Sequence, residues 1–207
     1  MNTLKRLFTL LSLSLLFLIT VISISAQTGP QPVVEANYEA VLHVLAASNH
    51  TVPGDALPTA LGAVSRQIRG DFGTANLRLV NTYLGRMSNT GSLEYKGVSN
   101  AYVQEPQAGT PSFLDWRLVG LRPLQNSAGQ GVYQFQSFRF GARVPVRIGG
   151  LPDDGGKVGA PVNYEAIGLT LDRMSVKENV PTLVGTLTQP KTDGTLFLIL
   201  TVKNVDK

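Results

Sequence analysis

The chain has no cysteine, and this absence excludes several chemistries. Thiol nucleophiles, thiolate metal sites, iron–sulfur clusters and disulfide bonds all need cysteine side chains. A chain of 207 residues is long enough to build a hydrophobic core that folds without disulfide bonds. The lack of cysteine is therefore compatible with a protein that is exported from the cell.

Histidine is scarce as well, since His43 and His50 are the two histidines of the chain. Neither has the neighbouring partners that a metal or catalytic site requires. Asp153 and Asp154 are adjacent residues in a glycine-rich loop, which is typical of a solvated turn. The sequence also has no G-x-S-x-G elbow, H-E-x-x-H helix, P-loop or dinucleotide-binding motif. We therefore predict a protein that is not an enzyme and has no catalytic residues, no metal site and no cofactor.

Charged residues make up only 15% of the chain, and its formal net charge is +4. Without the N-terminal Lys5 and Arg6, 16 basic side chains stand against 14 acidic ones, a net charge of +2. Proteins that bind nucleic acid usually show a concentrated basic field, so we do not expect a nucleic-acid partner. The 21 glycines and 12 prolines favour a turn-rich β protein instead.

The first 26 residues have the pattern of a secretory signal peptide. Lys5 and Arg6 form a short basic region, an apolar stretch covers Leu7–Ile24, and small residues follow. This pattern predicts cleavage after Ala26 and export to the periplasm or the extracellular space. The alternative is an uncleaved membrane anchor, because the apolar stretch approaches the roughly 20 residues that span a bilayer. Five serine and threonine residues interrupt the stretch, and no cysteine follows it to serve as a lipoprotein anchor.

Residues 33–205 are expected to form one α+β domain that consists mainly of antiparallel β-sheet, with one amphipathic helix packed on it. An alternative arrangement is a two-sheet β-sandwich with a peripheral helix. Segment 105–112 contains proline and glycine and is a candidate internal boundary. Alternating apolar residues and turn signals predict strands at 33–48, 76–87, 92–104, 112–124, 131–150, 162–171, 181–188 and 195–205.

The helix is expected over residues 55–70. Its apolar stripe, at spacings of four, three and four residues, consists of Leu57, Leu61, Val64 and Ile68. Asp55 can cap the start of this helix, and Gly70 can end it. We therefore expect one helix face to be buried against the sheet.

Finer features of the strands follow from the positions of their apolar residues. We expect residues 88–91 to form a hairpin turn, and Pro145 favours an edge position for its strand because it has no N–H group. Apolar side chains change from odd to even positions after residue 135, which predicts a β-bulge near Gln136–Ser137. The run Leu196–Leu200 is apolar on both faces, so its strand should be central and covered on both sides. One face of the strand 76–87 is expected to hold Leu77, Leu79, Tyr83 and Met87.

Three arginines recur at every fourth position of the stretch "RFGARVPVRIGG": Arg139, Arg143 and Arg147. They alternate with apolar residues, so they should lie on one side of a strand at intervals of about 13 Å. Five arginines face one acidic residue, Asp115, between residues 113 and 150. We therefore regard the three arginines as candidate binding residues for an anionic partner, such as an envelope protein or an anionic surface. The alternative is a solvated strand face whose charge prevents aggregation.

Residues 138–171 resemble the gate-hairpin segment of secretins, the outer-membrane channels of bacterial secretion systems. In that family, a strand with a G-x-x-V-P core precedes a glycine-rich loop and a V-x-Y-x-x-V-G-x-x-L strand. The matching residues here are Gly141, Val144 and Pro145, followed by Val162, Tyr164, Gly168 and Leu171. The sequence after residue 171 departs from the secretin pattern. The layout as a whole is similar to that of exported bacterial proteins without an assigned activity. The resemblance to secretins implies a role in the cell envelope.

Two functions from different classes follow from these observations. The leading hypothesis is a non-enzymatic envelope or secreted protein that binds a partner through a β-sheet surface. The alternative is a reduced secretin-like component that oligomerises in the outer membrane. Under the leading hypothesis only the signal segment contacts a membrane, whereas under this alternative the folded domain does so as well. Apolar residues in the strand 162–171 change parity, which favours a soluble, bulged sheet. A third hypothesis is an enzyme whose active site consists of Asp, Glu, Tyr and Arg side chains alone, but no sequence motif supports it.

Overall fold

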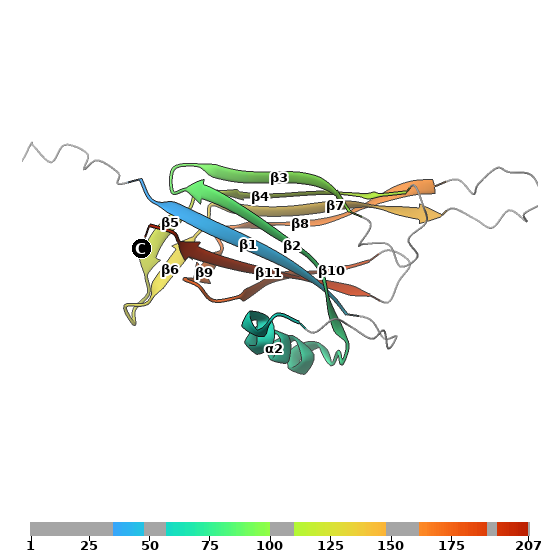
Figure 1. The fold of residues 1–207 in the computed structure, drawn as a ribbon, viewed down its shortest axis with the longest axis horizontal. Helices are drawn as coiled ribbons and strands as arrows, with labels where there is room; N and C mark the ends of the chain where they lie inside the picture. The colour runs from blue at the N-terminus through green and yellow to red at the C-terminus, as the bar shows by residue number, and fades with distance from the viewer. Residues whose placement is uncertain (1–34, 48–56, 100–109, 148–161, 190–193, 207) are drawn as a thin grey trace, which may run out of the picture. The chain divides into compact units, whose positions relative to one another are not determined.

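The chain folds into three antiparallel sheets and one α-helix within the residues that the structure describes (Figure 1). The computed structural model describes residues 35–47, 57–99, 110–147, 162–189 and 194–206. The predicted signal segment 1–26, the residues Asp55 and His50, and the loop that contains Asp153 and Asp154 lie outside these ranges. The α+β class and the predominance of antiparallel sheet are as the sequence predicts.

The first sheet contains a strand that is buried on both faces. Its strand β11 lies between β10 and β1, and its apolar residues are buried on both faces, as the run Leu196–Leu200 predicts. Within the predicted strand 33–48, residues Asn37–Ala47 form β1, as the content of valine and tyrosine favours. In spatial order the sheet consists of β10 (Thr182–Thr188), β11 (Thr195–Asn204), β1 (Asn37–Ala47) and β2 (Leu77–Ser88).

The second sheet faces the first, and a smaller third sheet is formed by the segments that follow β4 and β8 along the chain. In spatial order, the second sheet consists of β3 (Ser92–Ser99), β4 (Ser112–Val119), β7 (Ser137–Arg147) and β8 (Val162–Asp172). The third sheet consists of β5 (Arg122–Gln125), β6 (Gly131–Gln134) and β9 (Ser175–Lys177). The chain passes between the second and third sheets after β4, after β6 and after β8.

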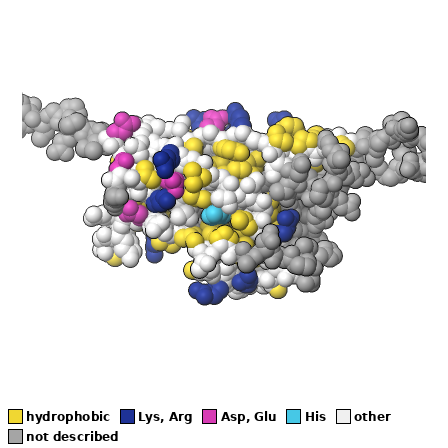
Figure 2. Space-filling model, viewed as in Figure 1, with side chains coloured by type: hydrophobic (Ala, Val, Ile, Leu, Met, Phe, Trp, Pro, Cys, Tyr) yellow, Lys and Arg dark blue, Asp and Glu magenta, His cyan; other side chains and the backbone are white. Residues whose placement is uncertain are grey.

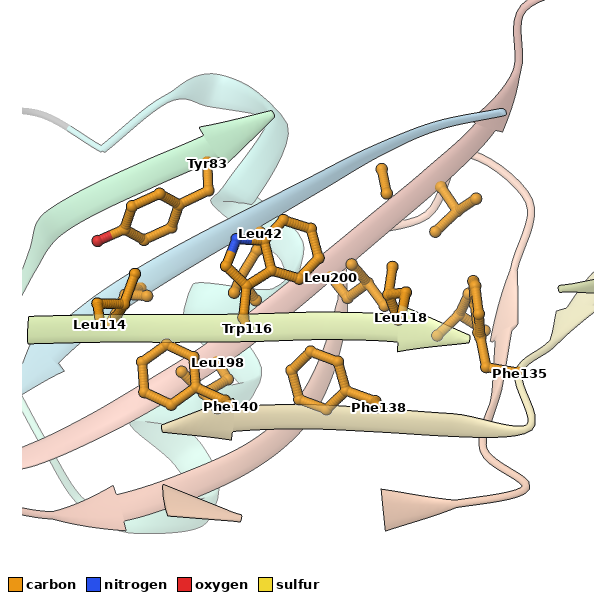
Figure 3. Close-up of a cluster of buried hydrophobic side chains, with 14 of the residues drawn as sticks. Leu42, Tyr83, Leu114, Trp116, Leu118, Phe135, Phe138, Phe140, Leu198 and Leu200 are labelled. Carbon is orange, nitrogen blue, oxygen red and sulfur yellow. The ribbon is translucent and has the colours of Figure 1, made fainter. Parts of the chain in front are cut away.

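The main core fills the space between the first and second sheets (Figure 3). Trp116, Phe138 and Phe140 point from the second sheet toward Leu42 and Leu198 of the first sheet, and all five are at most 1% exposed. Burial of each such side chain stabilises the fold by about 1.5–3 kcal/mol before conformational entropy is counted. The two sheets therefore form the sandwich that the sequence allowed as an alternative, with the helix on its periphery.

The helix covers the outer face of the first sheet at one end of β1. A 3₁₀ turn, Thr59–Leu61, leads into α2, Gly62–Phe72. The predicted apolar stripe is correct, because Leu61, Val64 and Ile68 are buried against Phe197 and its neighbours. The predicted end is wrong, since Gly70 lies inside the helix. The helix ends at Gly73, whose φ of 63° suits glycine and whose N–H donates to the Arg69 carbonyl at 3.1 Å.

The strand β2 does not present one continuous apolar face. Its pairing with β1 shifts at Val80, which has no partner between the Leu45–Leu79 and Val44–Asn81 pairs. Because one extra residue reverses the facing of all later side chains, Leu77 lies in the cluster under α2, whereas Tyr83 lies in the main core. The prediction of one shared face is therefore wrong. The bulge lets a single strand supply side chains to both cores.

Three other local predictions need correction. Residues 88–91 do form a turn, in which the Gly91 N–H donates to the Ser88 carbonyl at 3.1 Å, but β2 and β3 enter different sheets and do not pair as a hairpin. The parity change at Gln136–Ser137 is a crossing from the third to the second sheet, not a bulge within one strand. Strand β7 is central rather than an edge, although the pairing with β4 ends at Arg143, so Pro145 lies beyond it.

Candidate binding face of the second sheet

The outward-facing residues of the second sheet form one exposed face, which we call the arginine face. Their sequence neighbours point inward and fill the main core, because successive residues of a strand alternate between the two faces of a sheet. The described members are Ser92, Glu94, Lys96 and Val98 on β3, Phe113, Asp115, Arg117 and Val119 on β4, Ser137, Arg139, Gly141, Arg143 and Pro145 on β7, and Val162, Tyr164, Ala166, Gly168, Thr170 and Asp172 on β8.

Of the predicted arginines, Arg139 and Arg143 lie on this face, and Arg147 is described by its backbone pairing alone. Arg139 and Arg143 are exposed and point to the same side of β7. Arg147 ends the strand, where its backbone pairs with Val162 of β8. Arg139 lies 3.9 Å from an Asp115 carboxylate oxygen, whereas Arg143 forms no ion pair with any residue that the structure describes.

Acidic residues from two strands compensate part of the positive charge. Arg117 and Arg139 are directly opposite each other in the β4–β7 pairing, and like charges in such positions repel. Glu94 on β3 lies 3.9 Å from Arg117 and 2.9 Å from Lys96. The hydrogen bond from Lys96 lowers the pKa of Glu94 and raises the pKa of Lys96. These pairs are exposed, so they are worth little to stability, and they leave Arg143 as the unpaired cation of the described face.

The other end of the arginine face is apolar and aromatic. Phe113 and Tyr164 are 45% and 36% exposed, and their ring centroids lie 5.5 Å apart at an interplanar angle of 54°. Val98 and Val162 extend this patch and are 63% and 40% exposed. Arg143 is the pairing neighbour of Phe113 and therefore borders the apolar patch. Figure 2 shows the change along the upper edge of the molecule, from basic and acidic side chains to a group of hydrophobic ones.

These aromatic and apolar residues were not named as site residues from the sequence, although a signal for them exists. Phe113 lies at an odd position, whereas the buried Leu114 and Trp116 of the same strand lie at even positions. Val162 and Tyr164 differ in parity from the half-buried Leu169 in the same way. The parity change in β8 predicts a bulged sheet, but this prediction is wrong, because the β7–β8 register is unbroken. It marks apolar side chains on the exposed face instead.

A second group of charges lies on the first sheet and was also missed from the sequence. The Lys203 ammonium lies 2.7 Å and the Arg86 guanidinium 3.4 Å from the two carboxylate oxygens of Glu39, whose side chain is 9% exposed. The three residues are direct neighbours across β11, β1 and β2. The hydrogen bond from Lys203 lowers the pKa of Glu39, burial opposes this effect, and Arg86 adds to it. Each carboxylate oxygen of Glu39 thus has a cationic partner, so we regard the group as structural.

The described residues offer no arrangement for metal binding, since they contain no group of three histidine, cysteine or acidic side chains. His43 Nδ1 lies 2.9 Å from the Thr82 hydroxyl oxygen, and burial lowers the pKa of this histidine. Its contact is that of a half-buried sheet residue. None of the helices in the described ranges has the length and apolar character that crossing a membrane requires.

Comparison with known proteins gives only distant similarities. No protein-family model and no curated protein matches the chain. Among solved structures, the secretin domain of InvG from the Salmonella SPI-1 injectisome has a TM-score of 0.29 and 8% identity, over 93% of this chain and 68% of that one. A cryo-EM structure of the same secretin has a TM-score of 0.31 and 9% identity, over 93% of this chain and 70% of that one.

A third similar structure is the outer-membrane complex of the Klebsiella pneumoniae type II secretion system, with PulD, PulS and PulC. It has a TM-score of 0.23 and 12% identity, over 83% of this chain and 38% of that one. The two InvG structures are of a secretin, the family whose gate-hairpin segment residues 138–171 resemble in sequence. Because TM-scores this low show only a distant likeness, we infer the function from the residues of this chain alone.

Proposed function

We propose that the protein is an exported, non-enzymatic binding module whose arginine face binds an acidic segment of a protein partner. The observation that supports this proposal is the exposed Phe113–Tyr164 ring pair beside Arg143. Arg143 has no acidic partner within the described residues, so a carboxylate of the partner would not have to displace an existing ion pair.

The composition of this patch favours a protein over a lipid surface as the partner. Phenylalanine, tyrosine and arginine are enriched in protein–protein interfaces, and tyrosine and arginine dominate their energetic centres. The face carries four described basic residues, Lys96, Arg117, Arg139 and Arg143, against the three acids Glu94, Asp115 and Asp172. This excess complements an acidic segment, and the rings offer apolar area that a partner can cover.

The test is binding of poly-L-glutamate to the mature protein, measured by titration calorimetry at low ionic strength. Arg143→Gln and Phe113→Ala should each weaken binding about 5-fold to 10-fold, because each removes about 1–1.4 kcal/mol of contact. Arg66→Gln removes one exposed arginine from α2 and is the matched control, which should bind as the wild type does. Equal weakening by Arg66→Gln, or no weakening by Arg143→Gln, would contradict the proposal.

Binding to anionic vesicles distinguishes an acidic protein segment from an anionic membrane surface as the partner. We expect vesicles with phosphatidylglycerol to bind more weakly than poly-L-glutamate and to be insensitive to Phe113→Ala. Vesicle binding that is strong and lost in both variants would replace the acidic segment by an anionic membrane surface as the ligand.

Two further measurements test export of the protein and the alternative of a secretin-like oligomer. Expression of the full chain followed by mass determination of the product should give an N-terminus at Gln27 if residues 1–26 are removed. Light scattering of that product should give a monomer or dimer without detergent. A ring-sized assembly that needs detergent would overturn the binding module in favour of the secretin-like component.

A further inference from the structure

A polar pocket of about 450 Å³ lies where the chain passes between the second and third sheets. Three connections run side by side there, after β4, after β6 and after β8. Backbone hydrogen bonds join them, from the Gln136 N–H to the Val119 carbonyl at 2.9 Å and from the Arg173 N–H to the Gln136 carbonyl at 3.0 Å. The pocket is therefore built on paired backbone. Its lining residues are Gly120, Arg122, Gln134, Phe135, Gln136 and Arg173.

The connections approach each other so closely that one of them requires glycine. Gly120 has a φ of 66°, and a Cβ atom placed there would lie 2.8 Å from the Cβ of Gln136. Such a distance is shorter than real Cβ contacts, so an alanine would push the first two connections apart. The spacing of the pocket wall thus depends on this glycine.

Arg173 occupies a backbone conformation that arginine rarely adopts. Its φ is 55°, in the left-handed region that favours glycine, asparagine or aspartate. A long side chain at such a position is unexpected if the residue serves only the turn. Arg173 lines the pocket together with Arg122.

The charge of the pocket has one sign. None of its lining residues is acidic, and neither Arg122 nor Arg173 forms an ion pair within the described part of the chain. Gln134 and Gln136 add side-chain amides, which can donate further hydrogen bonds. Arg122 is the pairing neighbour of Gln134, so these two donors belong to adjacent strands. Two guanidinium groups with amide donors are the groups that proteins use for carboxylate and phosphate ligands.

We propose that this pocket binds a small anion through a carboxylate or phosphate group held by Arg122 and Arg173. The volume suits a small molecule rather than a protein segment. The site is separate from the arginine face, since none of its lining residues belongs to that face. The protein therefore has a small-ligand site in addition to the proposed surface for a macromolecular partner.

The experiment is titration calorimetry of the mature protein with inorganic phosphate and, separately, with succinate, at constant ionic strength. At least one of the two should bind with a Kd of about 1 mM or tighter. Arg122→Gln and Arg173→Gln should each weaken binding at least about tenfold, since each removes a charged donor. Preference for phosphate or succinate identifies which of the two groups the pocket takes.

Two further variants make the result specific. Arg66→Gln removes the same charge from α2 and should leave the affinity unchanged. Arg173→Gly should lose binding as Arg173→Gln does while melting at a temperature no lower than the wild type, because its φ suits glycine. No binding of either anion, binding that survives both pocket substitutions, or equal loss in Arg66→Gln would each overturn the proposal. Poly-L-glutamate binding through Arg143 is measured independently of these outcomes.

Discussion

Phe113 and Tyr164 contact each other across a strand that separates them. Phe113 belongs to β4 and Tyr164 to β8, with β7 between them, yet their ring centroids are 5.5 Å apart. Arg143 and Pro145 are the β7 residues that pair with Phe113 and Tyr164, respectively. The two rings therefore lie over the middle strand and join three strands on the exposed side of the sheet.

This contact should be measurable as a coupling energy. We expect the double variant Phe113→Ala, Tyr164→Ala to reveal a coupling of about 0.5–1 kcal/mol in the free energy of unfolding, typical of an aromatic pair. Urea unfolding can be followed by the fluorescence of Trp116, the single tryptophan, which is 1% exposed. Leu124 is similarly exposed at 46% but lies on the third sheet, so Leu124→Ala should show no coupling with Tyr164→Ala. Zero coupling between the two rings would contradict the contact.

The Glu39 group predicts how stability depends on pH. Because Lys203 and Arg86 lower the pKa of Glu39 from 4.5, its contribution is fully present above about 4.5 and is lost as the pH falls through the folded-state pKa. At neutral pH, Glu39→Gln should reduce the free energy of unfolding by about 1–2 kcal/mol, since the carboxylate is buried but its partners Arg86 and Lys203 are 68% and 48% exposed. At about pH 3 the difference between wild type and variant should shrink.

Urea unfolding of both proteins at the two pH values measures this effect. Glu165→Gln is the matched control, because Glu165 is exposed and forms no ion pair within the described residues. Its effect on the free energy of unfolding should stay within about 0.5 kcal/mol. A Glu39→Gln difference that is the same at both pH values would mean that the ion pairs do not stabilise the protein.

The spacing of apolar residues along the sequence correctly predicts those features of the fold that depend on a single segment. The stripe from Leu57 to Ile68 and the two apolar faces of Leu196–Leu200 each follow from local spacing, and the structure confirms both. The bulge at Val80 could not be predicted, because it depends on how β2 pairs with β1. The crossing at Gln136–Ser137 produces the same parity change as a bulge, so only the sheet arrangement distinguishes the two.

In the candidate site, too, features of a single strand could be predicted from the sequence, whereas contacts between strands could not. The positions of Arg139 and Arg143 on one strand face follow from their spacing. The pairing of Arg139 with Asp115, and of Arg117 with Glu94, depends on which strands are neighbours. A count of charges along the chain therefore overstated the free positive charge of this region. The aromatic patch was missed because exposed aromatic residues have the same spacing as buried ones.

Trp116 should tolerate replacement by phenylalanine better than its central position suggests. Its Nε1 is buried without a hydrogen-bond partner among the described residues, and a buried unsatisfied donor costs about 1–3 kcal/mol. Trp116→Phe leaves a cavity but removes this donor, so we expect a loss of less than about 1.5 kcal/mol. Trp116→Ala should cost about 3–5 kcal/mol. Circular dichroism in urea measures both, and a Trp116→Phe loss as large as that of Trp116→Ala would contradict the expected gain from removing the unsatisfied N–H.

The two glycines at the end of α2 should respond to alanine with opposite signs. Gly70 lies inside the helix with open space around a would-be Cβ, so Gly70→Ala should stabilise the protein by about 0.5–1 kcal/mol. Gly73 has a φ of 63°, so Gly73→Ala should destabilise it by about 1 kcal/mol, although no atom blocks the added Cβ. Thermal unfolding of the two variants should thus move in opposite directions. If the helix instead ended at Gly70, as its spacing in the sequence suggested, Gly70→Ala would be the destabilising variant, and the position of the left-handed residue would have to be reassigned.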